Sequence, residues 1–201
     1  KLLVLTPAGL AKHRAAVVLC DAADDRGGSW GENGEIIAAL NYTAGLSRVS
    51  SAGGSPRPLT ELNKAANEMT HRWPQLLPGD KAVLFTAHTR TSDFDEANIE
   101  VQSLKDGQRK SLHRGGSYGR YLPSGPGSSG TGHLVYVHQG ALFAAPFDLD
   151  RLEVTAPPAP VLEEVASSPT NGGAHFDFSR TGTFVFVSGK PGDEKWSVLW
   201  L

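Results

Sequence analysis

Six polar residues are candidates for a ligand site because they fall at corresponding places in repeated segments of the chain. Two of them, His71 and His175, each begin a segment that runs through aromatic residues into a tight turn. Imidazole, guanidinium, phenol and carboxylate groups that converge in one place can hold a peptide or a small polar ligand by hydrogen bonds. The six candidates are His71, Arg72, Tyr118, Arg120, His175 and Asp177.

Metal and hydrolytic sites have weaker support in the sequence. Zinc needs three or four N, O or S ligands, and the chain has neither a Cys-x-x-Cys nor a His-x-x-x-His pair. The acidic stretch with Asp93, Asp95 and Glu96 is a weak candidate for adventitious or structural Ca²⁺, which takes oxygens from flexible acidic loops. No catalytic residue and no required cofactor is predicted.

Composition limits the class of protein. The chain has 201 residues, of which 39% are hydrophobic, and its formal net charge is −2. The clustered basic face of a nucleic-acid-binding protein is not predicted, and no apolar run reaches the roughly 18 residues of a membrane span. The first residue is Lys1, so we expect a piece of a longer protein. The single cysteine, Cys20, ends an apolar segment and is predicted to be a buried, inert thiol.

The elements that position these residues follow from a unit of about 45 residues that recurs four times. Each unit runs from a Gly- or His-led aromatic segment through a tight turn into an apolar strand. The turns are Glu32-Asn33-Gly34, Pro78-Gly79-Asp80, Pro123-Ser124-Gly125 and Arg180-Thr181-Gly182. The strands are Ile36–Ala39, Ala82–Thr86, Leu134–Val137 and Phe184–Val187. Such units with several short strands predict an all-β propeller of four-stranded antiparallel blades.

The predicted propeller comprises about four blades' worth of sequence in one domain or propeller segment. Whole blades are expected at 27–60, 71–112 and 117–162, with three inner strands at 174–201 and two outer strands at 1–20. The terminal pieces complete one split blade within the chain, or are exchanged between two chains in a homodimer, or belong to a larger propeller. We favour exchange between chains, since open sheet edges invite association.

The repeated phrases resemble a known family. Residues 27–34 read Gly-Gly-Ser-Trp-Gly-Glu-Asn-Gly, residues 71–80 read His-Arg-Trp-Pro-Gln-Leu-Leu-Pro-Gly-Asp, and residues 175–182 read His-Phe-Asp-Phe-Ser-Arg-Thr-Gly. They resemble the TolB-like (PD40, WD40-like) β-propeller repeat, most nearly in propellers that follow bacterial serine/threonine kinase domains. Two turns depart from the family pattern: residues 78–80 invert its Asp-Gly order, and residues 32–34 lack its proline. The chain has no kinase signature.

The resemblance implies a non-catalytic binding or sensing module in a larger bacterial protein, and it slightly favours a location outside the cytoplasm. The expected partner is a protein, a peptide or a small polar ligand, bound at the channel mouth by the six candidates; no nucleic acid and no membrane insertion is expected. A lactonase- or esterase-like hydrolase with a metal or polar site in the mouth, and a purely structural assembly module, stay open. Trp30 and Trp73 are expected to pack between blades, and Trp196 and Trp200 to anchor the last strand.

Overall fold

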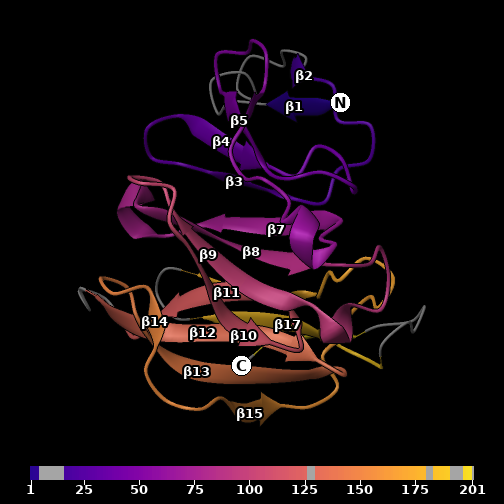
Figure 1. Ribbon diagram of the computed structural model, residues 1–201. Coiled ribbons are helices and arrows are strands. Elements are labelled where there is room, and N and C mark those ends of the chain that lie inside the picture. Colours follow the sequence, from indigo (N-terminus) through magenta and orange to yellow (C-terminus); the bar gives the residue numbers. More distant parts are fainter. Residues whose placement is uncertain (5–15, 126–129, 180–182, 191–196, 201) are drawn as a thin grey trace.

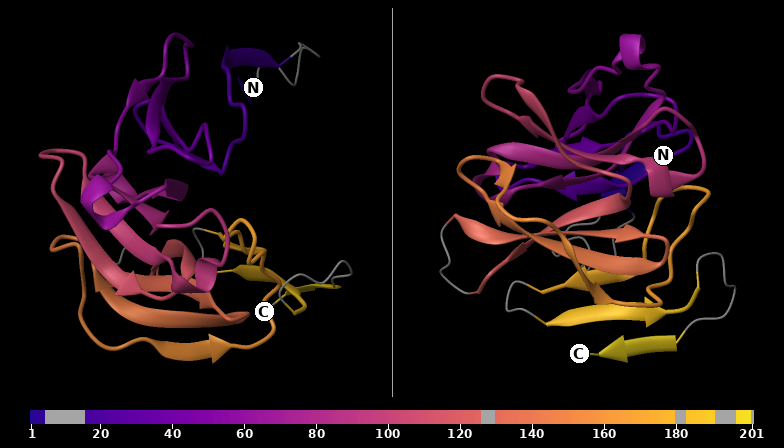
Figure 2. Two further views of the ribbon diagram at one scale, coloured as in Figure 1. Left: turned by 45° about the vertical axis from the view of Figure 1, so that its right-hand side comes forward. Right: turned by 60° about the horizontal axis from the view of Figure 1, so that its bottom comes forward.

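The computed structural model describes residues 1–4, 16–125, 130–179, 183–190 and 197–200. Its strands form five antiparallel sheets, three of which have at least four strands. Figure 1 shows these sheets stacked one after another along the chain, and the first view of Figure 2 shows that the stack follows an arc. The first strands of neighbouring sheets lie side by side on the inside of the arc.

Three sheets correspond to the predicted whole blades. The first contains β3 (Gly28–Trp30), β4 (Glu35–Ala38), β5 (Ser47–Ser50) and β6 (Arg57–Pro58). The second contains β7 (Thr70–Leu76), β8 (Ala82–His88), β9 (Asn98–Ser103) and β10 (Arg109–Arg114). The third contains β11 (Ser117–Pro123), β12 (Thr131–His138), β13 (Ala141–Asp148), β14 (Glu153–Val154) and β15 (Ala159–Leu162). The predicted all-β architecture of antiparallel blades is confirmed.

The third sheet has a fifth strand that the repeat did not predict. Its outermost position is divided between β14, which pairs with one half of β13, and β15, which pairs with the other half. Pro157 and Pro158 lie between the two short strands. Proline has no N–H to donate to a ladder, so it interrupts what would otherwise be one outer strand.

The terminal pieces form two separate partial sheets. β1 (Leu2–Val4) pairs with β2 (Val17–Cys20), while β16 (Phe176–Phe178), β17 (Phe184–Ser188) and β18 (Ser197–Trp200) form the other. In the described part of the chain these two sheets share no ladder, and Figure 2 places the N- and C-termini at opposite ends of the arc. Completion of a blade within one chain is therefore not observed; exchange between two copies stays a prediction.

The sheets are held together by apolar side chains that alternate along the central strands. All seven residues of β8 are buried. Ala82 and Leu84 pack toward the third sheet, and Val83, Phe85 and Ala87 pack toward the first. Successive side chains of a strand point to opposite faces, so an unbroken apolar run needs cover on both sides.

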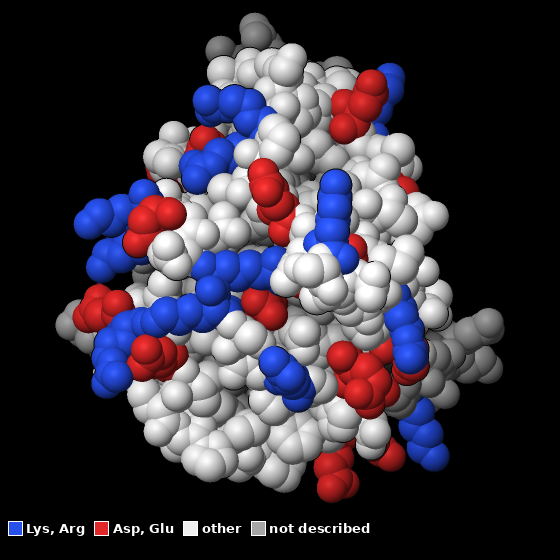
Figure 3. Space-filling model, viewed as in Figure 1, with Lys and Arg blue, Asp and Glu red and all other residues white. Residues whose placement is uncertain are grey.

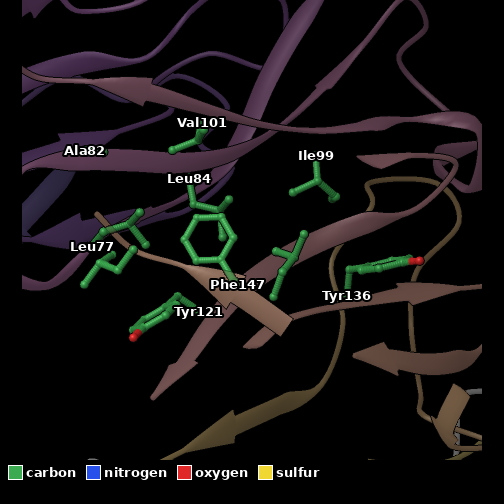
Figure 4. Packing of buried hydrophobic residues seen from close by; sticks show 10 residues of the cluster. Leu77, Ala82, Leu84, Ile99, Val101, Tyr121, Tyr136 and Phe147 are labelled. Atoms are coloured by element: carbon green, nitrogen blue, oxygen red, sulfur yellow. The ribbon is translucent and has the colours of Figure 1, made fainter. Parts of the chain in front are cut away.

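Figure 4 shows one such interface, where side chains from the second and third sheets point toward one another. Leu77, Leu84 and Ile99 come from the second sheet and meet Tyr121 and Phe147 of the third. Each of these side chains is at most 3% exposed. Stacking of the sheets is therefore driven mainly by burial of apolar surface.

The described helices are three short 3-10 turns: η1 (Lys64–Ala66), η2 (Pro78–Asp80) and η3 (Phe94–Glu96). None of them is long and apolar enough to cross a membrane. The predicted turn at Pro78 forms η2, in which Gly79 adopts a φ of 73°. The predicted turn at Arg180-Thr181-Gly182 lies outside the described residues.

Candidate binding site in the central channel

The inner strands β3, β7, β11 and β16 line the inside of the arc, which we call the channel. The connections from the preceding sheet enter these strands at one end of the channel, which we call the loop end. The strands turn back into β4, β8, β12 and β17 at the other end, the turn end. The six predicted ligand residues were expected at the loop end.

Polar side chains on the inner strands tie the first sheet to the second and the second to the third. The Ser29 hydroxyl accepts a hydrogen bond from the Leu76 N–H at 2.9 Å, and Gln75 Oε1 accepts one from the Tyr121 N–H at 2.6 Å. Arg120 Nη1 donates to the Trp73 carbonyl at 2.9 Å. These contacts satisfy backbone groups that would otherwise be unpaired between separate sheets.

A shared backbone distortion turns aromatic side chains toward the channel near its loop end. β7 and β11 each shift register once, and in each shift the residue with positive φ is aromatic: Trp73 (55°) and Tyr118 (56°). The Trp73 and Tyr118 rings lie 5.5 Å apart, and Phe176 lies 5.3 Å from Tyr118, both edge-on. Trp73 therefore packs between sheets as predicted.

Arg120 belongs to this aromatic group. Its guanidinium carbon lies 3.8 Å from the centre of the Tyr118 ring, a cation–π contact. Burial lowers the pKa of Arg120, while Tyr118 and the carboxylate of Asp177 oppose that shift. Tyr118 and Arg120 are thus brought together, and His175 and Asp177 are the exposed members of the predicted set.

His71 lies inside the protein, in a group of five residues that we call the His71 network. Its Nδ1 lies 2.7 Å from the Thr60 hydroxyl and its Nε2 lies 3.0 Å from Glu68. Glu68 also binds Arg109, whose Nε donates to Glu100 at 2.9 Å. The five residues are Thr60, Glu68, His71, Glu100 and Arg109.

The order hydroxyl, imidazole and carboxylate in this network is that of a hydrolytic triad. Thr60 is 4% exposed, however, and His71 is 0% exposed. The Thr60 oxygen also accepts the Leu46 N–H at 2.8 Å, so it has partners on two sides. No substrate can approach a hydroxyl enclosed in this way, so the network joins structural elements rather than performing catalysis.

Arg72 is also buried, at 1% exposure, and donates to three of the connecting loops. Its guanidinium binds the carbonyls of Tyr42 and Thr91 at 3.4 Å and that of Asn171 at 3.1 Å, and its Nε binds Thr70. Burial lowers the pKa of Arg72 to about 10, assisted by the positive charge of Arg26. Arg72 is therefore charged at neutral pH and holds the loops, instead of offering its donors to a ligand.

The acidic stretch does not gather its carboxylates. Asp93 pairs with Arg90 at 2.9 Å, while Asp95 Oδ1 accepts the Gln139 N–H at 2.8 Å. Among the residues that the structure describes, no three His, Cys, Asp or Glu side chains are grouped to hold a metal ion.

A hollow of about 540 Å³ lies at the turn end of the channel, and we call it the channel pocket. The ends of all four inner strands contribute to it, and so do the turns that follow β3, β7 and β11. Its lining includes Ser29, Trp30, Glu32, Gln75, Leu76, Pro78, Asp80, Tyr121, Pro123 and Phe178.

Trp30 corrects one sequence-based expectation. It was expected to pack between blades, yet it is 54% exposed at the pocket. Gly27 and Gly28, which precede it, provide no bulky side chain to cover its ring, and the first sheet has only a small partial sheet beyond it. The ligand site was predicted at the loop end because polar residues gather there; the exposure of Trp30 at the other end has no signal in the sequence.

One carboxylate of the pocket, that of Asp80, is fixed by backbone groups. Asp80 Oδ2 accepts the N–H of Glu32 at 2.8 Å and that of Asn33 at 3.3 Å, which links the turns of the first two sheets. Gly31 permits this approach, since a Cβ there would lie 2.9 Å from the same oxygen. Asp80 is consequently held in one orientation at the pocket wall.

A second hollow, of about 570 Å³, lies farther out between the turns of the first three sheets. Its charged groups largely neutralise one another: Arg48 pairs with Glu35 at 2.7 Å, and Lys81 pairs with Asp150 at 3.5 Å. Figure 3 shows the same mixture over the outer strands, where acidic and basic side chains lie next to each other. The channel pocket is therefore the better candidate for selective recognition.

Two segments match the Gly-x-Ser-x-Gly pattern of a nucleophile elbow, residues 27–31 and 115–119. An elbow places its serine on a sharp turn from a strand into a helix. Ser29 and Ser117 instead lie within inner strands, and Ser117 is 6% exposed. The pattern marks two equivalent strand starts rather than two nucleophiles.

Two other predictions concern side chains outside the channel. Cys20 is a free, partly buried thiol rather than a fully buried one, and burial, together with Asp21, raises its pKa. Trp196 and the side chain of Trp200 lie outside what the structure describes.

Comparison with solved structures decides the fold. The crystal structure of the calcium-binding protein regucalcin from Agrobacterium tumefaciens aligns with 89% of this chain at a TM-score of 0.57 and 16% identity. The chain is a β-propeller. It spans 58% of the regucalcin chain. The tricorn protease aligns with 88% of this propeller and 15% of its own length, at a TM-score of 0.48 and 12% identity.

The sequence comparisons do not assign the chain to a family. No protein-family model matches the propeller, and no curated protein matches it. The propeller fold is thus shown, while the TolB-like resemblance stays a prediction.

Proposed function

We propose that this propeller is a non-catalytic binding module that takes a peptide or small polar ligand in the channel pocket. The observation that carries the proposal is Trp30, a tryptophan that is 54% exposed in a hollow to which all four inner strands contribute. Large exposed aromatic side chains in concave sites are typical anchors for partners.

The contrast between the two ends of the channel supports this choice. At the loop end, His71 and Arg72 direct their polar atoms to other protein groups. At the turn end, the pocket combines apolar walls from Leu76 and Phe178 with a few fixed polar groups. A volume of about 540 Å³ falls within the usual range for ligand pockets.

At the loop end, we expect only secondary contacts with the ligand. His175, Asp177, Tyr118 and Arg120 lie toward it, and a long ligand that passes along the channel would reach them. The resemblance to propellers that follow kinase domains supports a sensing role within a longer protein. A hydrolytic role has no comparable support, because the triad-like hydroxyl of Thr60 is enclosed.

We expect Trp30→Ala to weaken ligand binding about tenfold or more, since loss of a central aromatic anchor removes most of its contact area. The probe is a displayed library of random peptides of about ten residues. Peptides recovered on the wild-type chain are labelled and titrated by fluorescence anisotropy.

The matched control is Tyr42→Ala, which removes another exposed aromatic side chain, 38% exposed, on the loop between β4 and β5. We expect this variant to bind like the wild type, and both variants to keep the wild-type melting temperature. Failure to recover any peptide, or equal binding by Trp30→Ala and the wild type, would overturn the proposed function.

A further inference from the structure

We infer that the channel pocket selects a cationic group, the ammonium of a lysine or the guanidinium of an arginine in an extended peptide. This inference rests on the proposed function, and it adds the chemical class of the ligand to it. It depends on the charges of the pocket, the exposed aromatic face and the fixed carboxylate.

The charged residues described in the pocket lining have one sign. Among the described residues that line it, the charged side chains are Glu32 and Asp80, and both are acidic. Lys81, which follows Asp80 in the sequence, pairs with Asp150 in the second hollow. The chain as a whole is nearly neutral, with a net charge of −2, so this local excess of negative charge is a property of the pocket.

The aromatic wall supplies the second element of cation recognition. Trp30 exposes more than half of its surface, and Phe178 lies in the same lining. A cation over an aromatic face is attracted by the ring quadrupole, and tryptophan is the strongest partner among the aromatic residues. A carboxylate beside an aromatic face favours an ammonium or guanidinium over a neutral apolar group.

The carboxylate is positioned before any ligand arrives. Asp80 Oδ2 is held by two backbone N–H groups of the neighbouring turn, at 2.8 and 3.3 Å. Its backbone has a φ of 51°, directly after Gly79 at 73°. A group that is already ordered loses little conformational freedom when a ligand binds, so charge recognition here has a low entropic cost.

The test uses the peptides recovered from the library described above. We expect lysine and arginine to be enriched among them, and replacement of the basic residue by acetyl-lysine or leucine to lower affinity about tenfold. The protein variant is Glu32→Gln/Asp80→Asn, in which the amide at position 80 retains an oxygen that can accept the N–H groups of residues 32 and 33. We expect it to discriminate between the lysine and acetyl-lysine peptides less than the wild type does, because only the cation–π attraction of Trp30 then remains.

The control is Glu61→Gln/Glu163→Gln, which removes two negative charges from exposed positions away from the pocket. It should preserve the lysine preference. Recovered peptides without basic residues, or unchanged discrimination by Glu32→Gln/Asp80→Asn, would overturn the inference. If such peptides still lose affinity with Trp30→Ala, the proposed function stands and only the cationic class fails; if no peptide is recovered, both fail.

Discussion

Replacing Glu68 by alanine is expected to destabilise the propeller by about 3 to 5 kcal/mol, because it leaves buried charged and polar partners unpaired. The Glu68 side chain is 7% exposed and binds both His71 and Arg109. It also accepts the Asn63 N–H at 2.7 Å, so one carboxylate joins η1, β7 and β10. For a chain of this length, each kcal/mol corresponds to roughly 2 to 4 °C in Tm.

The matched control is Glu61→Ala, which removes an exposed glutamate from the same connection. We expect it to change the free energy of unfolding by less than about 0.5 kcal/mol. Thermal and urea unfolding of both variants measure the difference. Equal stability of Glu68→Ala and the wild type would show that the His71 network contributes nothing to folding.

The same network predicts that the wild-type propeller loses stability on acidification. Burial lowers the pKa of His71, opposed by the hydrogen bond with Glu68, so the unfolded chain binds a proton on this residue more readily below pH 6.5. Burial alone would raise the pKa of Glu68, yet hydrogen bonds from His71 and Arg109 lower it well below its usual 4.5. Because the folded protein lowers the pKa of both His71 and Glu68, these residues contribute to the free energy of unfolding at neutral pH. That contribution is lost as the pH falls, first below 6.5 for His71 and then below 4.5 for Glu68.

Replacing Arg72 by methionine should be the other severe change, with an expected loss of about 3 kcal/mol or more. Methionine keeps most of the side-chain volume but leaves the Tyr42, Thr91 and Asn171 carbonyls without their shared donor. The guanidinium also packs over Phe94, 4.4 Å from its ring centre. Because three loops from different sheets lose one common contact, we expect a lower urea midpoint and a lower Tm.

Arg90→Met removes the same charge from an exposed side chain whose partner is Asp93. Such surface pairs contribute about 0 to 1 kcal/mol, so this control should remain close to the wild type. Arg72→Lys should recover little of the stability that Arg72→Met loses, because a lysine ammonium cannot reproduce the planar set of donors of a guanidinium. If Arg72→Met unfolds at the same urea concentration as Arg90→Met, the proposed role of Arg72 is wrong.

Much of the fold could be predicted from the sequence because its repeated turns and apolar strands obey local rules. Gly34 and Gly79 adopt positive φ in the predicted turns, and the apolar run of β8 packs on both faces. The divided outer strand of the third sheet was not predicted, since the pairing of β14 with β13 depends on the length of β13 as well as on local sequence. How the two terminal sheets pair could not be predicted from the sequence either, because that pairing depends on contacts between distant segments.

The site was predicted less well, for a physical reason. Sequence identifies polar residues on the inner strands but not whether a partner inside the protein already binds them. His71 and Arg72 are enclosed because Glu68 and three loop carbonyls meet them from distant parts of the chain. Trp30 is accessible because its neighbours in space are small or absent, which no property of tryptophan itself reveals.

The most direct test of the central claim is hydrogen–deuterium exchange of the full chain with and without a peptide recovered from the library. If the channel pocket is the binding site, protection should appear at residues 29–33, 75–80 and 121–123, where the inner strands reach the turn end. Protection confined to residues 88–96 and 171–177, at the loop end, would contradict it.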